Sequence, residues 1–390
     1  MNSRKHIILA MTCITILGAG MLAYARLSVD RTPVADPIPV AVSTPGMIYG
    51  TPELKSARAL TFSPEGILFI GDSMGGAVFA VDVKDTTKDT EGKPVEIKEI
   101  DKKIASLLGI TPDAVVINDI ATHPSSQNVY LAVSRGRGAD AVPVILRVNK
   151  SGGIEEVPLA NVQFSTAALK NAPGPEEKTQ RGGSKRALSI TDIAFSEGQL
   201  FVSGLSNEEF ASSVRRIPFP FKDDAASNTL EIFHAAHNKF ETHAPIETFM
   251  PVRLKGQPFL LASYTCTPLA AFPLAELQSK KHVRGTTLAE LGGGNRPLDM
   301  ITYQKEGKDY ILIANSNRTL ISLAAEDLEK AQPLTTGVTQ AYKSAGVGYL
   351  SIAQVGVLQL DNLNSAHVVV IQRDVENGTL NLRSLPKRWV

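Results

Sequence analysis

The sequence predicts an all-β protein in which six small sheets close into a ring, a six-bladed β-propeller. One pattern, an apolar strand, a tight turn, a second apolar strand and a polar tip, recurs six times at starts of 60, 120, 193, 250, 301 and 358. The starts are 51 to 73 residues apart. Each unit holds about four strands of about five residues, too little to bury both faces of a sheet alone. Radial stacking solves this, whereas an irregular β-sandwich would not require units of similar length.

The six units follow one another along the chain. The first three are LTFSPEGILFIGD, IATHPSSQNVYLAVSRG and IAFSEGQLFVSGLSN. The next three are MPVRLKGQPFLLASYT, ITYQKEGKDYILIANSN and LQLDNLNSAHVVVIQRD. Most units add a third strand, such as AVFAVDV or VPVILRV. Runs of this length bounded by Gly, Asn and Ser are typical of strands in hairpins.

The N-terminal segment differs from the rest. Residues 1–25 place two basic residues before a long apolar run that ends in Ala23-Tyr24-Ala25, the order of a secretory signal. The run is also long enough for an uncleaved membrane anchor. Residues 26–46 contain four prolines among small and polar residues, which favours an extended linker. We therefore expect a propeller over residues 47–390, periplasmic or secreted and tethered to the inner membrane if the segment is retained.

Composition narrows the class of partner. The chain has 390 residues, 43% hydrophobic and 20% charged, which is typical of a globular protein. Its formal charge is +1, and loss of residues 1–25 removes two basic residues and no acidic ones, giving −1. Nothing in this balance indicates a nucleic-acid partner. Only Cys266 remains after residue 25, so no internal disulfide can form.

One connection predicts a helix. IDKKIASLLG, residues 100–109, has apolar positions at helical spacing between the first and second units. We expect a short surface helix there.

Polar side chains recur where the innermost strand of a unit begins and where its second strand ends. In a propeller both positions meet at the rim of the central channel, and rigid scaffolds carry binding groups on such loops. Asp and Asn at strand ends also cap turns, so a purely structural role stays open. The expected ligand contacts are Arg135, Arg137, Asn207, Glu208, Glu209, Cys266, Asn317 and Arg318.

The first unit, ARALTFSPEGILFIGDSMGGAVFAVDV, resembles the blade pattern of the NHL and gluconolactonase-like (senescence-marker) propellers. The resemblance covers about thirty residues: an apolar strand, a Pro-Glu-Gly turn, a strand ending in Gly-Asp and a loop of small residues. Gluconolactonase-like and paraoxonase-like propellers hold a divalent cation in the channel with carboxylate and amide oxygens. The resemblance implies the ligands Asp119, Asp192, Asp299 and Asn315 for calcium or zinc.

A histidine cluster is the other chemical feature. FHAAHNKFETHAPIETF, residues 233–249, carries His234, His237 and His243 with Glu241. These side chains could ligate zinc or copper, completed by Cys266 or Met250, or could act as acid and base groups near the rim. Histidines that only cap turns are the alternative.

Two functions follow from these features. One is an exported propeller that binds a small molecule or an exported protein partner at the polar rim. The other is a metal-dependent hydrolase or lactonase, with a divalent cation at the channel mouth that polarises an ester carbonyl and His234, His237, His243 or Glu241 as the catalytic group.

Overall fold

The structure is a computed structural model that describes residues 44–222, 225–340 and 342–390. The predicted signal segment and almost all of the predicted linker lie outside these residues. Within the described ranges, no helix combines the length and apolar character needed to cross a membrane.

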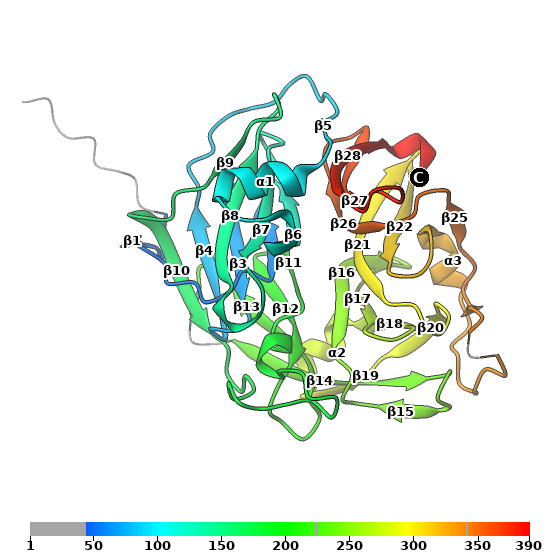
Figure 1. The fold of residues 1–390 in the computed structure, drawn as a ribbon. Coiled ribbons are helices and arrows are strands. Elements are labelled where there is room, and N and C mark those ends of the chain that lie inside the picture. The colour runs from blue at the N-terminus through cyan, green and yellow to red at the C-terminus, as the bar shows by residue number, and fades with distance from the viewer. Residues whose placement is uncertain (1–43, 223–224, 341) are drawn as a thin grey trace, which may run out of the picture. The chain divides into compact units, whose positions relative to one another are not determined.

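The described chain forms six sheets, or blades, antiparallel except where β14 and β19 pair parallel, and each is started by one of the six hairpins found in the sequence (Figure 1). We number the blades by the chain order of their innermost strands. Blade 1 contains β2 (Ala59–Phe62), β3 (Ile67–Asp72), β4 (Ala77–Asp82), β10 (Val162–Ala168) and β1 (Ile48–Gly50). Blade 2 contains β6 (Val115–Thr122), β7 (Val129–Arg135), β8 (Val142–Val148) and β9 (Ile154–Glu156). Blade 3 contains β11 (Asp192–Ser196), β12 (Gln199–Leu205), β13 (Ser212–Pro218), β14 (Ala226–His234) and β15 (Lys239–Glu241), with β19 (His282–Arg284) beside β14.

The second half of the chain supplies the other three blades. Blade 4 contains β16 (Ile246–Leu254), β17 (Gln257–Tyr264), β18 (Pro268–Pro273), β20 (Thr286–Glu290) and β24 (Ala345–Gly346). Blade 5 contains β21 (Pro297–Lys305), β22 (Lys308–Asn315), β23 (Leu320–Ala324) and β25 (Leu350–Ile352). Blade 6 contains β26 (Val357–Asn362), β27 (His367–Arg373), β28 (Leu380–Pro386) and β5 (Glu96–Ile97). The α-helices of the described residues are α1 (Ile100–Leu108), α2 (Leu274–Ser279) and α3 (Ala325–Lys330).

The order of the blades around the ring is not the order of the chain. Strand β2 packs between β6 and β11, and β6 packs between β2 and β26. The ring therefore runs 1, 3, 4, 5, 6, 2 and back to 1. The six-bladed fold is confirmed, but neighbours in sequence are not always neighbours in the ring.

Two strands, β5 and β10, hold the blades in this order by pairing with strands that are far away in the sequence. After blade 1 the chain passes to blade 6, where β5 pairs with β28, and then enters blade 2. After blade 2 it returns to blade 1, where β10 pairs with β4 and carries β1 on its other edge. Both returns tie segments that are far apart in the chain and cover edges that would otherwise be free to pair with another molecule.

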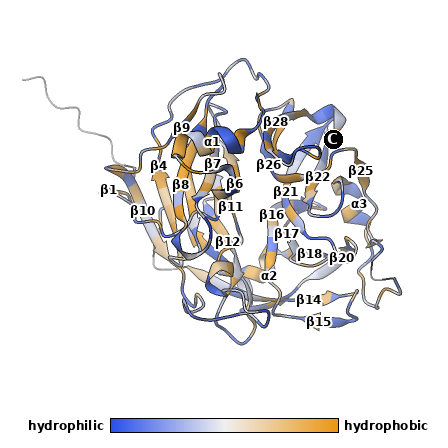
Figure 2. Ribbon diagram, in the orientation of Figure 1, coloured by the Kyte–Doolittle hydropathy of each residue, from blue (hydrophilic) through white to orange (hydrophobic). Residues whose placement is uncertain are grey.

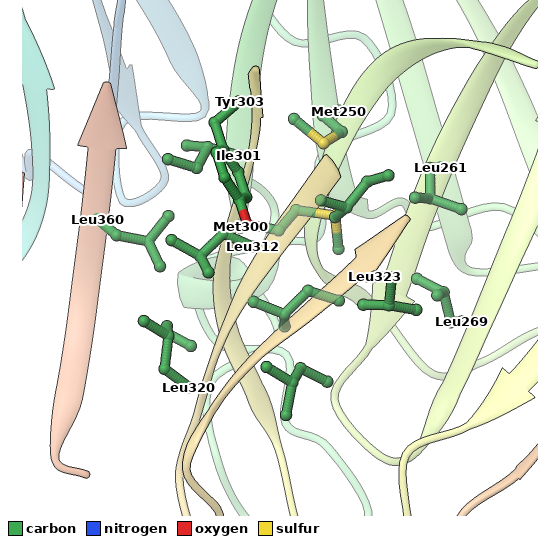
Figure 3. Close-up of a cluster of buried hydrophobic side chains, with 14 of the residues drawn as sticks. Met250, Leu261, Leu269, Met300, Ile301, Tyr303, Leu312, Leu320, Leu323 and Leu360 are labelled. Atoms are coloured by element: carbon green, nitrogen blue, oxygen red, sulfur yellow. The ribbon is translucent and has the colours of Figure 1, made fainter. Parts of the chain in front are cut away.

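A core cluster fills the space between neighbouring blades. Separate clusters join blade 1 to blade 2, blade 1 to blade 3, blade 3 to blade 4, and blade 2 to blade 6, and one larger cluster joins blades 4, 5 and 6. Figure 3 shows part of the larger cluster, with Leu261, Leu312 and Leu360 contributed by blades 4, 5 and 6. The strands are mostly apolar and the connecting loops mostly polar (Figure 2). Burial between sheets therefore holds the ring.

The expected helix is confirmed as α1. Ile100, Ile104 and Leu108 are buried at helical spacing, and Gly109 closes the helix with a left-handed conformation (φ 65°). The three apolar side chains pack in the cluster that joins blades 2 and 6.

The tight turns follow the sequence closely. Between β11 and β12, Glu197 and Gly198 both have positive φ, 49° and 73°. This is the pattern of a two-residue type I′ hairpin turn, in which glycine avoids the strain of a side chain. Lys255-Gly256 and Glu306-Gly307 repeat it in blades 4 and 5.

Candidate functional site

The central channel contains two cavities, one at each end of the innermost strands. The cavity near the starts of these strands, which we call the channel mouth, has a volume of about 190 Å³. The other, the lower cavity, has about 280 Å³. Every blade contributes to the channel mouth, which is lined by Arg58, Ile117, Asn118, Asp119, Thr191, Asp192, Glu247, Thr248, Arg296, Leu298, Asp299, Leu358 and Gln359.

The strand starts are irregular at the same level in four blades. The pairing register shifts just before Asp119, Thr248, Asp299 and Gln359, as in a β-bulge. A bulge re-aims the following side chain, and bulges gather at barrel rims and binding sites. The bulges therefore help to direct these four side chains toward the channel.

Asp119, Asp192 and Asp299 line both cavities, so they form the floor that separates them. The expectation that these three residues converge on one opening is met. We call them the carboxylate floor. Asp361 lies two residues deeper, because Gln359 occupies the bulge level in blade 6, and it lines only the lower cavity.

Each of these carboxylates bridges two blades in the same way. One oxygen accepts the N–H of the next residue in its own strand, at 2.7 to 2.8 Å. The other accepts an N–H from the next blade: Asp119 from Leu60, Asp192 from Phe249, Asp299 from Leu360 and Asp361 from Thr122. The bridges follow the ring order and not the chain order. The four carboxylates thus contribute to closing the ring.

Ionisation of these four carboxyl groups is unfavourable because they are buried. Burial raises the pKa of Asp192 to about 6 and that of Asp361 to about 6, although hydrogen bonds from backbone N–H groups oppose the rise. Burial, followed by the charge of neighbouring carboxylates, raises the pKa of Asp119 and Asp299 well above the usual range. All four side chains keep partial contact with the channel. Protonation of a floor carboxyl group would lower this repulsion and supply an O–H donor.

Above the floor, one carboxylate lies between two guanidinium groups. Glu247 is only 7% exposed, and its Oε1 lies 3.8 Å from Arg58 Nη2 and 3.7 Å from Arg296 Nε. Burial raises the pKa of Glu247, and the charges of Arg296 and Arg58 oppose that rise. Both distances exceed a direct hydrogen bond. Neither arginine side chain makes a hydrogen bond to a described residue, so their N–H groups are available at the mouth.

The contacts expected at the blade tips lie outside both cavities. Arg135, Asn207 and Glu209 are in or beside tip loops. Arg137 donates to Asp113 O at 2.6 Å, and Glu208 accepts from Asn171 at 2.8 Å.

The blade 5 tips are engaged with neighbouring loops. Asn317 donates to Gly294 O, and Arg318 donates to Tyr342 O at 2.8 Å. Asn315 is buried, accepts from Asn295 at 2.7 Å and donates to Ile313 O and Thr319 O. Neither cavity includes Asn315, so it is separate from the three aspartates with which the resemblance groups it.

A second site joins blades 3 and 4. Ligand atoms of His234, His237 and Cys266 all lie within 4.8 Å of one another, the one such group of three found in the described residues. His234 ends β14, His237 lies in the following turn, and Cys266 lies in the loop between β17 and β18. The N–H of Thr265 donates to Pro245 O just before β16 begins, which puts this loop on the face that carries the channel mouth.

Glu241 holds both imidazoles. His234 Nδ1 donates to Glu241 Oε2 at 2.9 Å, and His237 Nδ1 donates to Oε1 at 2.7 Å. Burial alone would lower the pKa of His234, but Cys266 and Glu241 raise it to about 9. Burial would raise the pKa of Glu241, and the two histidines lower it to about 2. The bond with His234 lowers the pKa of the Cys266 thiol.

Two residues of the histidine hypothesis stay outside this group. His243 is exposed beyond β15, and Met250 lines the lower cavity from β16. Sequence reasoning did not single out Asp361, Gln359, Thr191 or the buried Glu290, which accepts from the N–H of Ala235 at 2.7 Å. The run LDN around Asp361 resembles LDM around Asp299. However, Asp361 lies two residues further from the β-bulge of its strand than Asp299 does, so the two positions do not align.

Comparisons with known proteins assign neither a family nor a function to this chain. No family model matches the chain, and no curated protein matches it. Among solved structures, one chain of the mitotic checkpoint complex is 10% identical (TM-score 0.36) and is matched over 88% of this chain and 92% of that chain. The β-propeller domain of Myceliophteria thermophila Cps50 (Swd1) is 11% identical (TM-score 0.35), with 84% and 83% covered.

A third structure, dihydro-heme d1 dehydrogenase NirN in complex with DHE, is 11% identical (TM-score 0.32), with 84% of this chain and 56% of that chain covered. Likeness at this level carries no ligand or activity to this chain. None of these comparisons shows an NHL or gluconolactonase-like family.

Proposed function

We propose that this protein is an exported propeller that binds a small anionic molecule, such as an organic acid or a phosphate ester, at its channel mouth. The observation that carries the proposal is the position of Glu247 between Arg58 and Arg296, at 3.8 and 3.7 Å. At the level of the opening two cations face one acid, and the carboxylate floor below opposes their positive charge only to the extent that it is ionised.

The chemistry of the mouth supports a ligand that carries both charge and hydroxyl groups. Arginine presents several N–H donors in a planar fork that matches carboxylate and phosphate oxygens. Below the arginines, the carboxylate floor retains protons more readily than ordinary aspartates do. A protonated carboxyl group donates a hydrogen bond, so the floor is suited to a ligand oxygen.

The size of the mouth favours a small molecule over a protein segment. Its volume of about 190 Å³ falls below the range of about 300 to 1,000 Å³ typical of sites for drug-sized ligands. A protein partner would instead contact the tips that carry Arg135, Asn207 and Glu209. Export is proposed from the N-terminal segment, and membership of the NHL or gluconolactonase-like group from the first unit.

Binding to a panel of small anions tests the proposal. Isothermal titration of the full chain with mono- and dicarboxylates, sugar acids and sugar phosphates should find at least one ligand that binds with defined stoichiometry. Loss of one charge-assisted hydrogen bond costs about 1.5 to 3 kcal/mol. Arg58→Ala and Arg296→Ala should therefore each weaken binding about tenfold or more.

The matched control is Arg253→Ala, on β16 beyond the channel, where the side chain is 65% exposed and pairs with Glu197. It should bind as the wild type does. The proposal fails if no anion in the panel binds, or if the Arg58 and Arg296 variants bind the ligand with unchanged affinity.

A second candidate is a metal-dependent hydrolase or lactonase, favoured by one observation. Asp119, Asp192 and Asp299 lie on one floor, and carboxylate oxygens are the ligands that calcium prefers. However, each oxygen already accepts a backbone N–H, and the floor does not bring three ligand atoms within 4.8 Å of one another. Calcium-dependent hydrolysis of lactones, abolished by Asp299→Ala, would support this candidate over the first.

A further inference from the structure

Outside the channel, the group of His234, His237 and Cys266 has the chemistry of a metal centre. Its ligand atoms lie within 4.8 Å of one another. Bonds of about 2.0 to 2.3 Å to zinc separate tetrahedral ligands by somewhat less than this, so a small closure of the side chains completes the geometry. Zinc prefers imidazole and thiolate donors, whereas calcium and magnesium prefer oxygen donors.

We propose that His234, His237 and Cys266 bind one zinc ion in an open tetrahedral site, with water as the fourth ligand. This inference is independent of the proposed anion site, which uses other residues.

The surroundings support a built site. Metal-bound histidines commonly donate their second ring N–H to a carboxylate, which fixes the tautomer and the ring orientation. Glu241 serves both histidines in this way through their Nδ1 atoms, at 2.9 and 2.7 Å. His237 Nε2 then remains for the metal, whereas His234 Nε2, now 3.3 Å from Thr267 Oγ1, would exchange that contact for the metal. The two ring centroids lie only 3.9 Å apart, in keeping with the short separation of the candidate ligand atoms.

The elements that carry the ligands are firmly held. His234 is 1% exposed and belongs to β14, which pairs along its length with β13, β19 and β15. The turn that follows is anchored because Glu290, itself 1% exposed, accepts the N–H of Ala235 and Ala236. Thr267, next to Cys266, donates to the same carboxylate. Ligands from two blades are therefore positioned by one buried acid.

Exposure indicates that the fourth position is open. The side chain of His237 is 51% exposed and Cys266 is partly exposed, while His234 closes the inner side. Structural zinc sites use four protein ligands, and sites with three keep a position for water. Copper bound by two histidines and a cysteine commonly adds a distant methionine, but Met250 lies in the lower cavity. Zinc is thus the better match.

Zinc competition tests the proposal. The reduced, metal-free full chain should remove one equivalent of zinc per chain from a chromophoric chelator. Cys266→Ser and His237→Ala should each weaken zinc binding at least about 100-fold, and Glu241→Gln about 10- to 100-fold, as expected for a ligand-orienting carboxylate. His243→Ala is the matched control: it removes an exposed histidine of the same segment and should leave zinc affinity unchanged.

The absorption spectrum of bound cobalt is a second readout. Replacing Cys266 would not change this spectrum if the residue had only a structural role. Cobalt-loaded wild type should show a tetrahedral visible spectrum and a thiolate-to-cobalt band in the ultraviolet, and Cys266→Ser should lose that band. Without metal, Cys266→Ser and His237→Ala should unfold at the same temperature as the metal-free wild type, because both side chains are partly exposed. Arg58→Ala should bind zinc normally, which separates failure of this site from failure of the anion site.

The proposal is overturned if the wild type takes up no zinc, or if Cys266→Ser and His237→Ala retain wild-type affinity. Isolation of the protein with stoichiometric copper in place of zinc, from cells grown with both metals, would also overturn the assignment.

Discussion

Asp192→Asn should change the pH dependence of stability more than stability itself. The pKa of Asp192 is about 6 in the folded protein and 3.8 without such an environment. Between these values the folded state binds the proton more tightly than the unfolded state does. The free energy of unfolding contributed by this group therefore falls as pH rises from about 4 to about 6, and stays low above pH 6. A shift of about two units corresponds to about 3 kcal/mol.

The substitution has two opposite effects. Asparagine does not ionise, so the loss of about 3 kcal/mol above pH 6 disappears. It also presents an NH₂ group in place of one acceptor, which leaves the N–H of Phe249 or Ile193 without its partner. That costs about 1 to 3 kcal/mol at every pH. Asp192→Asn should be less stable than the wild type near pH 4.5 and equal to it or more stable at pH 8.

Denaturant unfolding at several pH values measures this difference. The gap between variant and wild type should change by about 2 kcal/mol from pH 4.5 to pH 8, because about a third of the effect is already lost at pH 4.5. Asp140→Asn, which makes the same chemical change at an exposed tip, should run parallel to the wild type. Parallel curves for Asp192→Asn as well would refute the idea that the floor carries a raised pKa.

Three further outcomes are expected. Glu247→Gln removes the charge shared by Arg58 and Arg296 and should tighten anion binding several-fold by titration; weaker binding would contradict a purely competing role for this acid. Ile104→Ala, in a fully buried position of α1, should lower the free energy of unfolding by about 2 to 5 kcal/mol, and a loss below 1 kcal/mol would mean that α1 is not part of the core. Gly198→Ala places a side chain at φ 73° and should cost about 1 to 2 kcal/mol, whereas an unchanged midpoint would argue against the type I′ turn.

The inner hairpins were predictable because each is local. Alternation, turn glycines and polar tips lie within about twenty residues, so the sequence alone located all six blades and α1. The same locality made the convergence of Asp119, Asp192 and Asp299 predictable, since each lies in the first part of an innermost strand. The proximity of Cys266 to two of the histidines was one of the options derived from ligand chemistry.

The ring order was not predictable from the repeats. Nothing in a hairpin specifies which neighbour it packs against, and apolar faces of similar composition fit several partners. Blade 2 takes its place between blades 6 and 1 through the two-residue β5 and the seven-residue β10, neither of which belongs to a repeated hairpin. Arg58, Glu247 and Arg296 come from three different blades, so their pairing appears only once the ring is closed.

The central claim is that the channel mouth binds a small anion. The most direct measurement is a crystal structure of the protein with the anion that binds most tightly in solution. We predict density for its acidic group between the guanidinium groups of Arg58 and Arg296, with the remainder directed toward the carboxylate floor. An empty mouth with the anion bound at the blade tips, in crystals at saturating ligand, would contradict the claim.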